Sequence, residues 1–269
     1  LGLRHIIGKQ NVDFIIGGPP CQAYSIHGRA TDKDSMQNDY RNYLFESFVK
    51  VVDAFKPKAF IFENVTGMLS AKPGGIPVVN RIYNAFNKIG YVTLAPEIFK
   101  DAVFNAYNYF VPQNRERVIL IGIKKGENFT LDAFYHSLAT NVSKRHLTVR
   151  DAIGGLPPIY PLKTIGKIKG KNHSHYATND SDKFHMPRHC SERDIQVIKE
   201  WISKGMNKCT QQEAINFYKK VTGRTTLYRK YRNLEWDEPS PTVVAHLQKD
   251  GFMFIHPDIN QARFITCLL

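Results

Sequence analysis

The stretch VDFIIGGPPCQAYS, from Val12 to Ser25, decides how the first part of this chain folds. Its apolar residues Val12 and Phe14–Ile16 form a short run, bounded by turn residues, that is typical of a buried strand. Gly17-Gly18 lets the backbone turn where a side chain would clash, and Pro19-Pro20 stiffens the chain that follows. We therefore expect Cys21 on a rigid loop at a strand end, where α/β sheets place their chemistry, or simply packed as a small apolar residue.

Strands and helices alternate along the sequence beyond this loop. The spacing of apolar residues predicts a helix over 44–55 that ends before Lys56-Pro57, and a second helix that begins at Pro77 and ends before Gly90. The runs KAFIFENV, YVTLAPEIF and ERVILIGIK predict strands over 58–65, 91–99 and 116–124. Strand–helix alternation favours an open α/β sheet with crossover helices.

The character of the sequence changes after Asp151. Residues 153–184 are rich in Gly, Pro and Lys and predict extended loops with short strands. Two helices follow, with start signals at Ser191 and Thr210, each of which has an acidic residue three positions later. We divide the chain into a first domain over 1–154, a smaller basic domain over 155–235 and a return segment over 236–269.

Composition and charge narrow the range of functions. The 269 residues carry a net charge of +13, and no apolar run is long enough to span a bilayer. The four cysteines form no CxxC pair, which favours a reducing compartment. Residues 155–235 hold 16 Lys and Arg against 7 Asp and Glu, a surplus of 9 that leaves only +4 for all other residues. This concentration of charge favours nucleic acid as a partner over a merely solvated basic face.

Three segments carry candidate chemistry: GGPPCQ (Gly17–Gln22), ENV (Glu63–Val65) and QNRERVILIG (Gln113–Gly122). Each lies at a predicted strand end or loop, so Cys21, Glu63 and the pair Arg115 and Arg117 could meet at one edge of a parallel sheet. Together they would supply a nucleophile, an acid or hydrogen-bonding group, and fixed positive charge. Taken singly, Glu63 is equally a strand-end cap and the arginines a surface pair.

In this order the three segments resemble those of the DNA (cytosine-5) methyltransferase family, of the bacterial restriction-modification type. The resemblance extends to EPSPTVVAH (Glu238–His246) and HPDINQARFIT (His256–Thr266), so it runs from Val12 to Thr266. It implies a Rossmann-like sheet that uses S-adenosylmethionine, with residues 1–154 as catalytic domain and 155–235 as target-recognition domain. It also implies a bacterial cytoplasmic protein associated with the nucleoid.

The resemblance implies a mechanism for the candidate residues. The Cys21 thiolate would attack carbon 6 of a flipped-out cytosine in duplex DNA, because carbon 5 is a poor nucleophile until the ring is activated. Glu63 would bond ring nitrogen 3 and the exocyclic amine, while Arg117 and, less directly, Arg115 would favour the anion and hold the base. Carbon 5 would then take the methyl group of S-adenosylmethionine.

The resemblance also implies contacts with DNA and cofactor. Residues 23–42 match the loop that closes over the flipped base, in which Ser25 would lie beside the DNA backbone. His27 matches a position that fills the vacated stack, although an ordinary loop histidine is an equal alternative. Arg41, Gln113 and Thr242 match further DNA-binding positions, and Pro20 and Leu44 match positions that line the cofactor.

The sequence departs from the family pattern at both ends. Before Val12 there is no FxGxG turn for the cofactor and no acidic residue for its ribose, and the chain stops soon after Thr266. We therefore expect an incomplete cofactor site and uncovered apolar surface on the sheet, and with it either poor solubility of the chain alone or association with a complementing polypeptide. The chain could equally be a truncated copy, a domain fragment or one half of a split enzyme. The alternative is a catalytically inactive, truncated methyltransferase that acts only as a DNA-binding module. An unrelated thiol enzyme would leave Glu63, the arginines and the basic domain unexplained.

A histidine-rich stretch raises the question of a metal. His173, His175, His185, His189 and Cys190 lie within a short span, but their spacings fit no standard zinc pattern. We expect loop histidines that face DNA or solvent, and no metal site.

Overall fold

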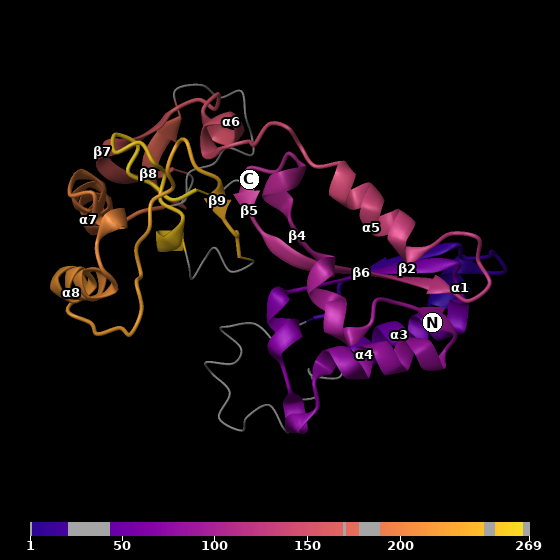
Figure 1. Ribbon diagram of the computed structural model, residues 1–269. Helices are drawn as coiled ribbons and strands as arrows, with labels where there is room; N and C mark the ends of the chain where they lie inside the picture. Colours follow the sequence, from indigo (N-terminus) through magenta and orange to yellow (C-terminus); the bar gives the residue numbers. More distant parts are fainter. Residues whose placement is uncertain (1, 21–43, 169–170, 178–188, 245–250, 266–269) are drawn as a thin grey trace. The chain divides into compact units, whose positions relative to one another are not determined.

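The computed structural model describes residues 2–20, 44–168, 171–177, 189–244 and 251–265 (Figure 1). The chain divides into two compact units. Unit 1 comprises Leu1–Tyr109 and Arg115–Lys144, and unit 2 comprises Phe110–Asn114 and Arg145–Leu269. Within the described ranges, no helix has both the length and the apolar character needed to cross a membrane.

Unit 1 is built on a five-stranded sheet in which β1, β2, β6 and β3 follow one another and β4 also pairs with β6. The strands are β1 (Phe14–Gly17), β2 (Ala59–Asn64), β3 (Tyr91–Val92), β4 (Val103–Asn105) and β6 (Glu116–Lys124). Only β1 and β2 are parallel, because β6 runs antiparallel to β2, β3 and β4. The α/β class is as predicted, but the sheet is mixed rather than parallel.

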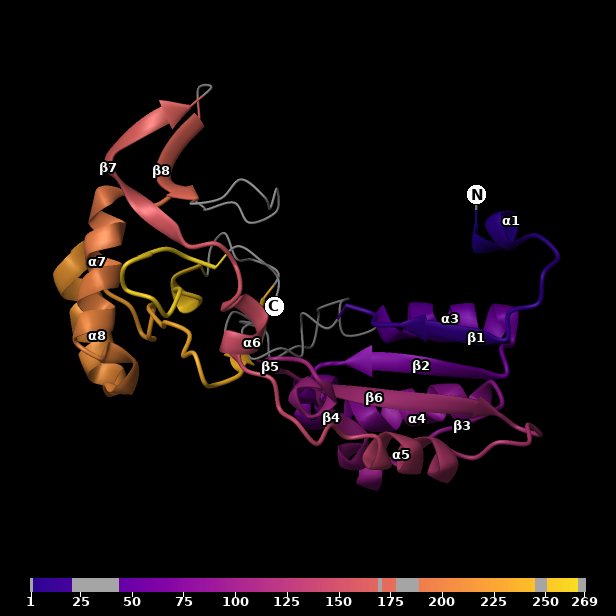
Figure 2. The same cartoon turned by 90° about the horizontal axis from the view of Figure 1, so that it is seen from above.

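Helices cover both faces of this sheet. They are α3 (Leu44–Phe55), α4 (Val78–Lys88) and α5 (Leu131–Thr140), whereas the short helix α1 (Leu3–Ile7) has no buried residue. Figure 1 shows α3 and α4 on one side of the sheet and α5 on the other, and Figure 2 shows the strands from above. The predicted helices over 44–55 and 78–88 are confirmed, and Gly90, with a φ of +91°, follows the second helix as expected.

The core of unit 1 lies between the sheet and the pair α3 and α4. Its centre is aromatic: the ring of Phe48 on α3 lies 5.5 to 6.2 Å from the rings of Phe60, Phe62 and Phe86. All four side chains are at most 9 % exposed. Edge-to-face contacts of this kind stabilise aromatic cores beyond the area that they bury.

The opposite face of β1 is apolar and open. Ile15 packs against the core, whereas Phe14 and Ile16 point away from it and are 44 % and 72 % exposed. On the short helix α1, Leu3 and Ile6 are also exposed, at 51 % and 78 %. The exposure of Phe14 and Ile16 agrees with the uncovered apolar surface expected on the sheet.

Unit 2 combines a hairpin with helices. Its elements are β5 (Gln113–Asn114), α6 (Val149–Ile153), β7 (Ile159–Ile168), β8 (Lys171–Ala177), α7 (Glu192–Ser203), α8 (Gln211–Thr222) and β9 (Ser240–Pro241). The hydroxyls of Ser191 and Thr210 accept the backbone N–H groups of Asp194 and Glu213, so the predicted capping boxes at the starts of α7 and α8 are confirmed. Trp201, Phe217 and Tyr231 form the aromatic centre of its helical part.

One predicted strand differs from the structure. The predicted strand over 91–99 shrinks to β3, because a 3-10 helix begins at Pro96 and runs to Ala102. The compact units divide at Lys144 and Arg145, and Val149 and Ile153 of α6 pack in one cluster with Leu234 of unit 2. The assignment of catalytic and recognition domains to the chain stays a prediction.

Candidate active site

Two of the predicted site residues meet at one edge of the unit 1 sheet. The Nε atom of Arg117 lies 2.9 Å from Oε1 of Glu63, and the two side chains are 19 % and 37 % exposed. This ion pair fixes the orientation of the carboxylate. A carboxylate that is accessible yet oriented can still exchange its partner for a substrate.

The strand register explains why these residues meet. In the antiparallel pair of β2 and β6, Glu63 lies opposite Ile119, which shares a face of β6 with Arg117. Arg117 is therefore the diagonal cross-strand neighbour of Glu63, within reach of a long side chain. Because β6 is antiparallel, its first residues lie at the edge where β1 and β2 end.

The backbone that leads to Cys21 passes directly over the carboxylate. A Cβ atom on Gly18 would lie 2.6 Å from Oε2 of Glu63, and one on Gly17 would lie 2.5 Å from the ring of Phe48. Neither glycine has a positive φ, so the reason for glycine here is space rather than backbone conformation. Cys21 itself lies outside the described residues.

Arg115 lies at the same edge of the sheet and is held there by hydrogen bonds of its backbone. Its N–H donates to Oδ1 of Asn105 at 3.1 Å, and its carbonyl accepts from the N–H of Ala106 at 2.9 Å. Asn105 Oδ1 also accepts the N–H of Tyr107, so one side chain holds the turn beside the start of β6. The sequence analysis missed Asn105, whose signal is an amide residue just before a loop.

Gln113 and Thr242 are brought together in unit 2. The two-residue strands β5 and β9 pair in parallel, with Gln113 opposite Ser240. Oε1 of Gln113 accepts the N–H of Val243 at 3.3 Å, and the hydroxyl of Thr242 donates to the carbonyl of Asn114 at 2.8 Å. Gln113 is only 5 % exposed, so its side chain holds the return segment. The DNA contacts expected of both residues stay predictions.

The remaining predicted residues lie at or inside an undescribed range. Pro20 is exposed at its start and Leu44 is half-buried at its end. Ser25, His27 and Arg41 lie outside the described residues, as Cys21 does. Their expected contacts with DNA therefore stay predictions.

The described residues fit S-adenosylmethionine only in part. Pro20 and Leu44 offer apolar contact, but the segment before Val12 has neither a glycine-rich turn for the cofactor's carboxylate end nor an acidic residue for its ribose. These residues alone do not make a complete cofactor site.

One histidine of β8, His175, is part of the packed structure of unit 2. His175 is buried between Ser174 and Gln261: Ser174 Oγ lies 2.9 Å from Nδ1, and Nε2 lies 3.0 Å from the carbonyl of Gln261. Burial lowers the pKa of His175, so the ring is neutral at pH 7. Among the described residues, no group of three or more His, Cys, Asp or Glu could hold a metal ion. His185 is outside them.

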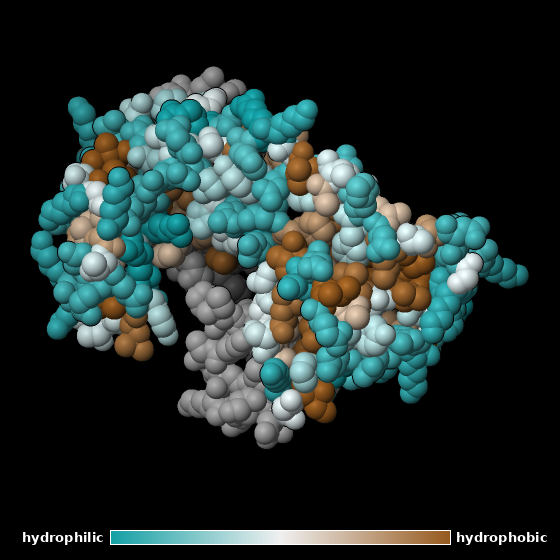
Figure 3. Space-filling model, viewed as in Figure 1, coloured by the Kyte–Doolittle hydropathy of each residue, from teal (hydrophilic) through white to brown (hydrophobic). Residues whose placement is uncertain are grey.

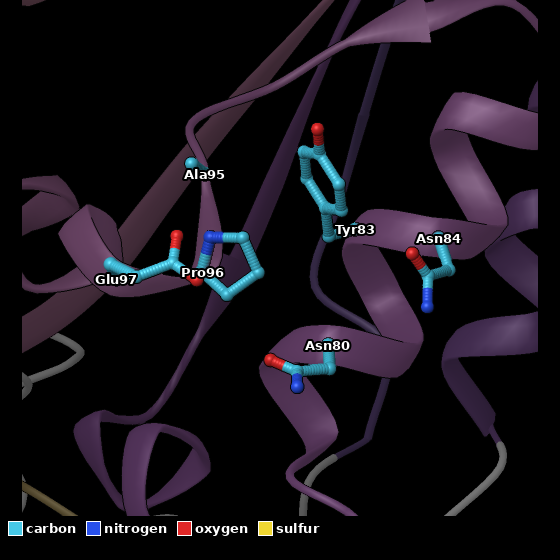
Figure 4. A pocket seen from close by; sticks show the side chains of 6 residues that line it. All are labelled: Asn80, Tyr83, Asn84, Ala95, Pro96 and Glu97. Carbon is cyan, nitrogen blue, oxygen red and sulfur yellow. The ribbon is translucent and has the colours of Figure 1, made fainter.

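A shallow polar cavity of about 300 Å³ lies elsewhere in unit 1 (Figure 4). Asn80, Tyr83 and Asn84 of α4 line one side, and Ala95–Glu97 line the other. None of the predicted site residues lines it, so it is separate from the site at Glu63 and Arg117.

Comparison with known proteins decides the family. The model of the C-5 cytosine-specific DNA methylase family matches residues 5–266. The chain belongs to this family. The match spans both compact units and includes every predicted site residue.

Two curated relatives match over 95 % of the chain. The Type II methyltransferase M.Bpa9945I of Bacillus paralicheniformis is 38 % identical, and M.DdeI of Desulfomicrobium norvegicum is 31 % identical. The chain spans 60 % of the length of each. A solved structure, described as a prophage-encoded DNA modification methyltransferase of E. coli, shares the fold with a TM-score of 0.52 at 23 % identity. The match covers 98 % of this chain and 70 % of the chain in that structure.

Proposed function

We propose that this chain is the catalytic and target-recognition part of a bacterial restriction-modification enzyme that methylates carbon 5 of cytosine in duplex DNA. The observation that carries the proposal is the Glu63–Arg117 ion pair. It lies against the backbone of Gly18, three residues before Cys21. Membership of the methylase family, with Type II methyltransferases as relatives, supports the same reaction. The substrate would place the protein on the nucleoid, in the bacterial cytoplasm.

Each residue of this edge has a defined task in the proposal. The thiolate of Cys21 adds to carbon 6 of the cytosine and makes carbon 5 nucleophilic. Glu63, at least transiently protonated, bonds ring nitrogen 3 and the exocyclic amine, which removes the charge that the addition places on the ring. Arg117 orients Glu63 and, with Arg115, stabilises the anionic form of the site. Once carbon 5 has taken the methyl group, loss of its proton and expulsion of Cys21 restore the ring.

The target base has to leave the duplex for this reaction, because its ring is stacked inside the helix. We propose that Ser25, His27 and Arg41 contact the opened duplex, and that Gln113 and Thr242 contribute from the β5–β9 ladder. Residues 155–235, with their surplus of positive charge, would contact phosphates and read the target in the major groove.

S-adenosylmethionine supplies the methyl group when it is bound. Pro20 and Leu44 are the residues of this chain that would contact it. We propose that a further segment, on this polypeptide or on another, completes the cofactor site and covers the apolar face of β1. The exposure of Phe14 and Ile16 supports this, because apolar sheet surface of this kind is normally buried.

The decisive experiment uses duplex DNA that contains 5-fluorocytosine, on which the Cys21 adduct cannot lose a carbon 5 proton and stays covalent once methylated. The chain is incubated with this DNA and S-adenosylmethionine, alone and with the part of M.Bpa9945I that it does not cover. Methyl transfer from labelled S-adenosylmethionine to ordinary duplex DNA is measured in parallel. The matched variants are Cys21→Ser and Cys209→Ser, since Cys209 is a free, half-buried cysteine of unit 2.

We expect capture and methyl transfer in the complemented sample, loss of both in Cys21→Ser, and wild-type behaviour in Cys209→Ser. Activity of the chain alone would refute the need for a further segment. Capture that survives in Cys21→Ser would refute the mechanism. DNA binding without capture in either sample would instead favour the alternative, a catalytically inactive DNA-binding module.

A further inference from the structure

The loop after α8 presents two large apolar side chains to solvent. Helix α8 ends at Gly223, which has a φ of +71°, and the chain then turns through residues 224–230, here called the α8 loop. At its tip Leu227 is 76 % exposed and Tyr228 is 56 % exposed. In Figure 3 apolar colour lies just below α8, where Figure 1 places this loop. Exposed apolar side chains that lie together, with polar residues around them, are candidates for contact with a partner.

Hydrogen bonds hold the α8 loop in this conformation. The hydroxyl of Thr226 accepts the N–H of Tyr228 at 3.2 Å and lies 3.1 Å from its carbonyl. Nε2 of Gln211, at the start of α8, donates to the carbonyl of Leu227 at 3.2 Å. The tip is therefore fixed by side chains on both sides of the turn, and its apolar groups are presented before any partner arrives.

The far end of the loop is anchored in the core of unit 2. The guanidinium of Arg229 donates to the carbonyls of Asn207 and Cys209 and lies 5.9 Å from the ring centre of Trp201. Trp201 is fully buried. Arg229 therefore has a structural role in the loop. The exposed basic side chains of the loop, Arg224 and Lys230, are the ones that can contact a ligand.

The segment that carries the tip is basic along its sequence. The sequence KKVTGRTTLYRKYR, residues 219–232, contains six basic residues and no acidic residue. Arg224 and Lys230 are both exposed, and the ammonium of Lys230 lies 5.5 Å from the ring centre of Tyr228. A fixed apolar tip flanked by exposed basic side chains is complementary to duplex DNA, which offers base edges and thymine methyl groups between rows of phosphates.

We infer that the α8 loop is a DNA-contacting element of this chain, with Leu227 and Tyr228 against base edges in a groove and Arg224 and Lys230 on the flanking phosphates. The inference rests on the proposed function, and it assigns part of the target contact to four named side chains. Phe129 lacks this setting and serves as the control: it is 41 % exposed and has Glu127 two positions before it.

The first test locates the contact directly. The full chain is irradiated on a mixed-sequence duplex in which 5-bromouracil replaces thymine, and is then digested with trypsin. Cleavage after Arg224 and Arg229 yields the peptide TTLYR, residues 225–229, as a separate fragment. We expect a nucleotide adduct on this peptide at Tyr228, absent in Tyr228→Ala. Adducts on other peptides with none on TTLYR would overturn the inference.

The second test separates the apolar from the ionic contacts. The dissociation constant of the full chain for the same duplex is measured from 50 to 300 mM salt. We expect Leu227→Ser with Tyr228→Ala to weaken binding about tenfold at every salt concentration, with the salt slope unchanged. We expect Arg224→Ala to lower the slope of log Kd against log salt by about 0.9, the change for one lost phosphate contact. The matched control, Phe129→Ala, is expected to bind as the wild type does.

The outcomes distinguish this inference from the function on which it rests. A wild-type chain that binds no DNA would refute the proposed function, and this inference with it. A wild-type chain that binds DNA while the loop variants bind equally well would overturn the inference alone. Unchanged fluorescence of Trp201 in the variants confirms that unit 2 is folded, since the loop anchor Arg229 lies beside that ring.

Discussion

Gly17, the last residue of β1, has no room for even one methyl group. The Cβ of Gly17→Ala would lie 2.5 Å from Cε2 and 2.8 Å from Cδ2 of Phe48, whereas carbon atoms pack at about 3.5–4.0 Å. The Phe48 ring would have to move by about 1 Å, toward the rings of Phe60, Phe62 and Phe86 that surround it. Overpacking typically costs about 1–3 kcal/mol, and we expect the upper half of this range.

Gly18 is the matched position, because its neighbour can move. The Cβ of Gly18→Ala would lie 2.6 Å from Oε2 of Glu63, which is the end of a side chain that is 37 % exposed. The carboxylate can swing aside, so we expect a stability change within about 0.5 kcal/mol. It would then leave its 2.9 Å contact with Arg117, and covalent capture of 5-fluorocytosine is expected to fail.

Urea unfolding and 5-fluorocytosine capture by the complemented chain test both glycines. Gly17→Ala is expected to lower the urea midpoint and leave the slope unchanged, and Gly18→Ala is expected to keep the midpoint and lose capture. Equal midpoints for wild type and Gly17→Ala would refute the packing argument. Capture by Gly18→Ala at the wild-type rate would refute the placing of Glu63 in the site.

Three further changes follow from the same contacts. Glu63→Gln is expected to reduce methyl transfer by the complemented chain at least about 100-fold, while the thermal midpoint reports a loss below about 1 kcal/mol, because the pair with Arg117 is partly exposed. Gly122→Ala would place a Cβ 2.1 Å from the ring of Phe60 and is expected to cost about 2 kcal/mol or more in urea unfolding; wild-type stability would contradict this. Burial lowers the pKa of His175, so the unfolded chain takes up a proton below pH about 6.5 that the folded chain does not. Stability is therefore expected to fall as the pH drops from 7.5 to 5.5, and a thermal midpoint that falls equally in His175→Gln would speak against this.

Local signals in the sequence predicted most of the helices. These signals lie within or next to the helix that they predict, so no knowledge of the rest of the chain is needed. They are the capping residues Ser191 and Thr210 and the apolar spacing over 44–55 and 78–88. The short strand β3 was overestimated because the apolar run continues past Pro96, where a 3-10 helix begins instead. Helix α5 was missed, since its apolar face is weak and none of its residues is buried.

The direction of strand β6 could not be read from its residues. An apolar run such as ERVILIGIK has the same pattern in either direction, and only its partners decide between them. The sequence therefore placed Glu63 and the arginines at one edge for the wrong reason, a parallel sheet. In the structure the antiparallel β6 begins at the edge where β2 ends.

Contacts across long stretches of sequence were also beyond prediction. The pairing of β5 with β9 joins Gln113 to Ser240, and two-residue strands carry no periodic signal. The close approach of Gly18 to Glu63 depends on the register of β1 against β2. The family resemblance indicated which residues to expect at the site. The distances between their atoms come only from the structure.

The antiparallel entry of β6 also has a consequence for folding. Glu63 and Arg117 are more than 50 residues apart, and they meet only after β2 and β6 have paired along their whole length. Pairing over such a separation is slow, because the entropy of loop closure is lost before the contacts form. A nascent chain that has emerged only as far as β4 would thus carry the thiol and the carboxylate without their counter-ion. The Glu63–Arg117 pair therefore forms only once β6 has joined the sheet.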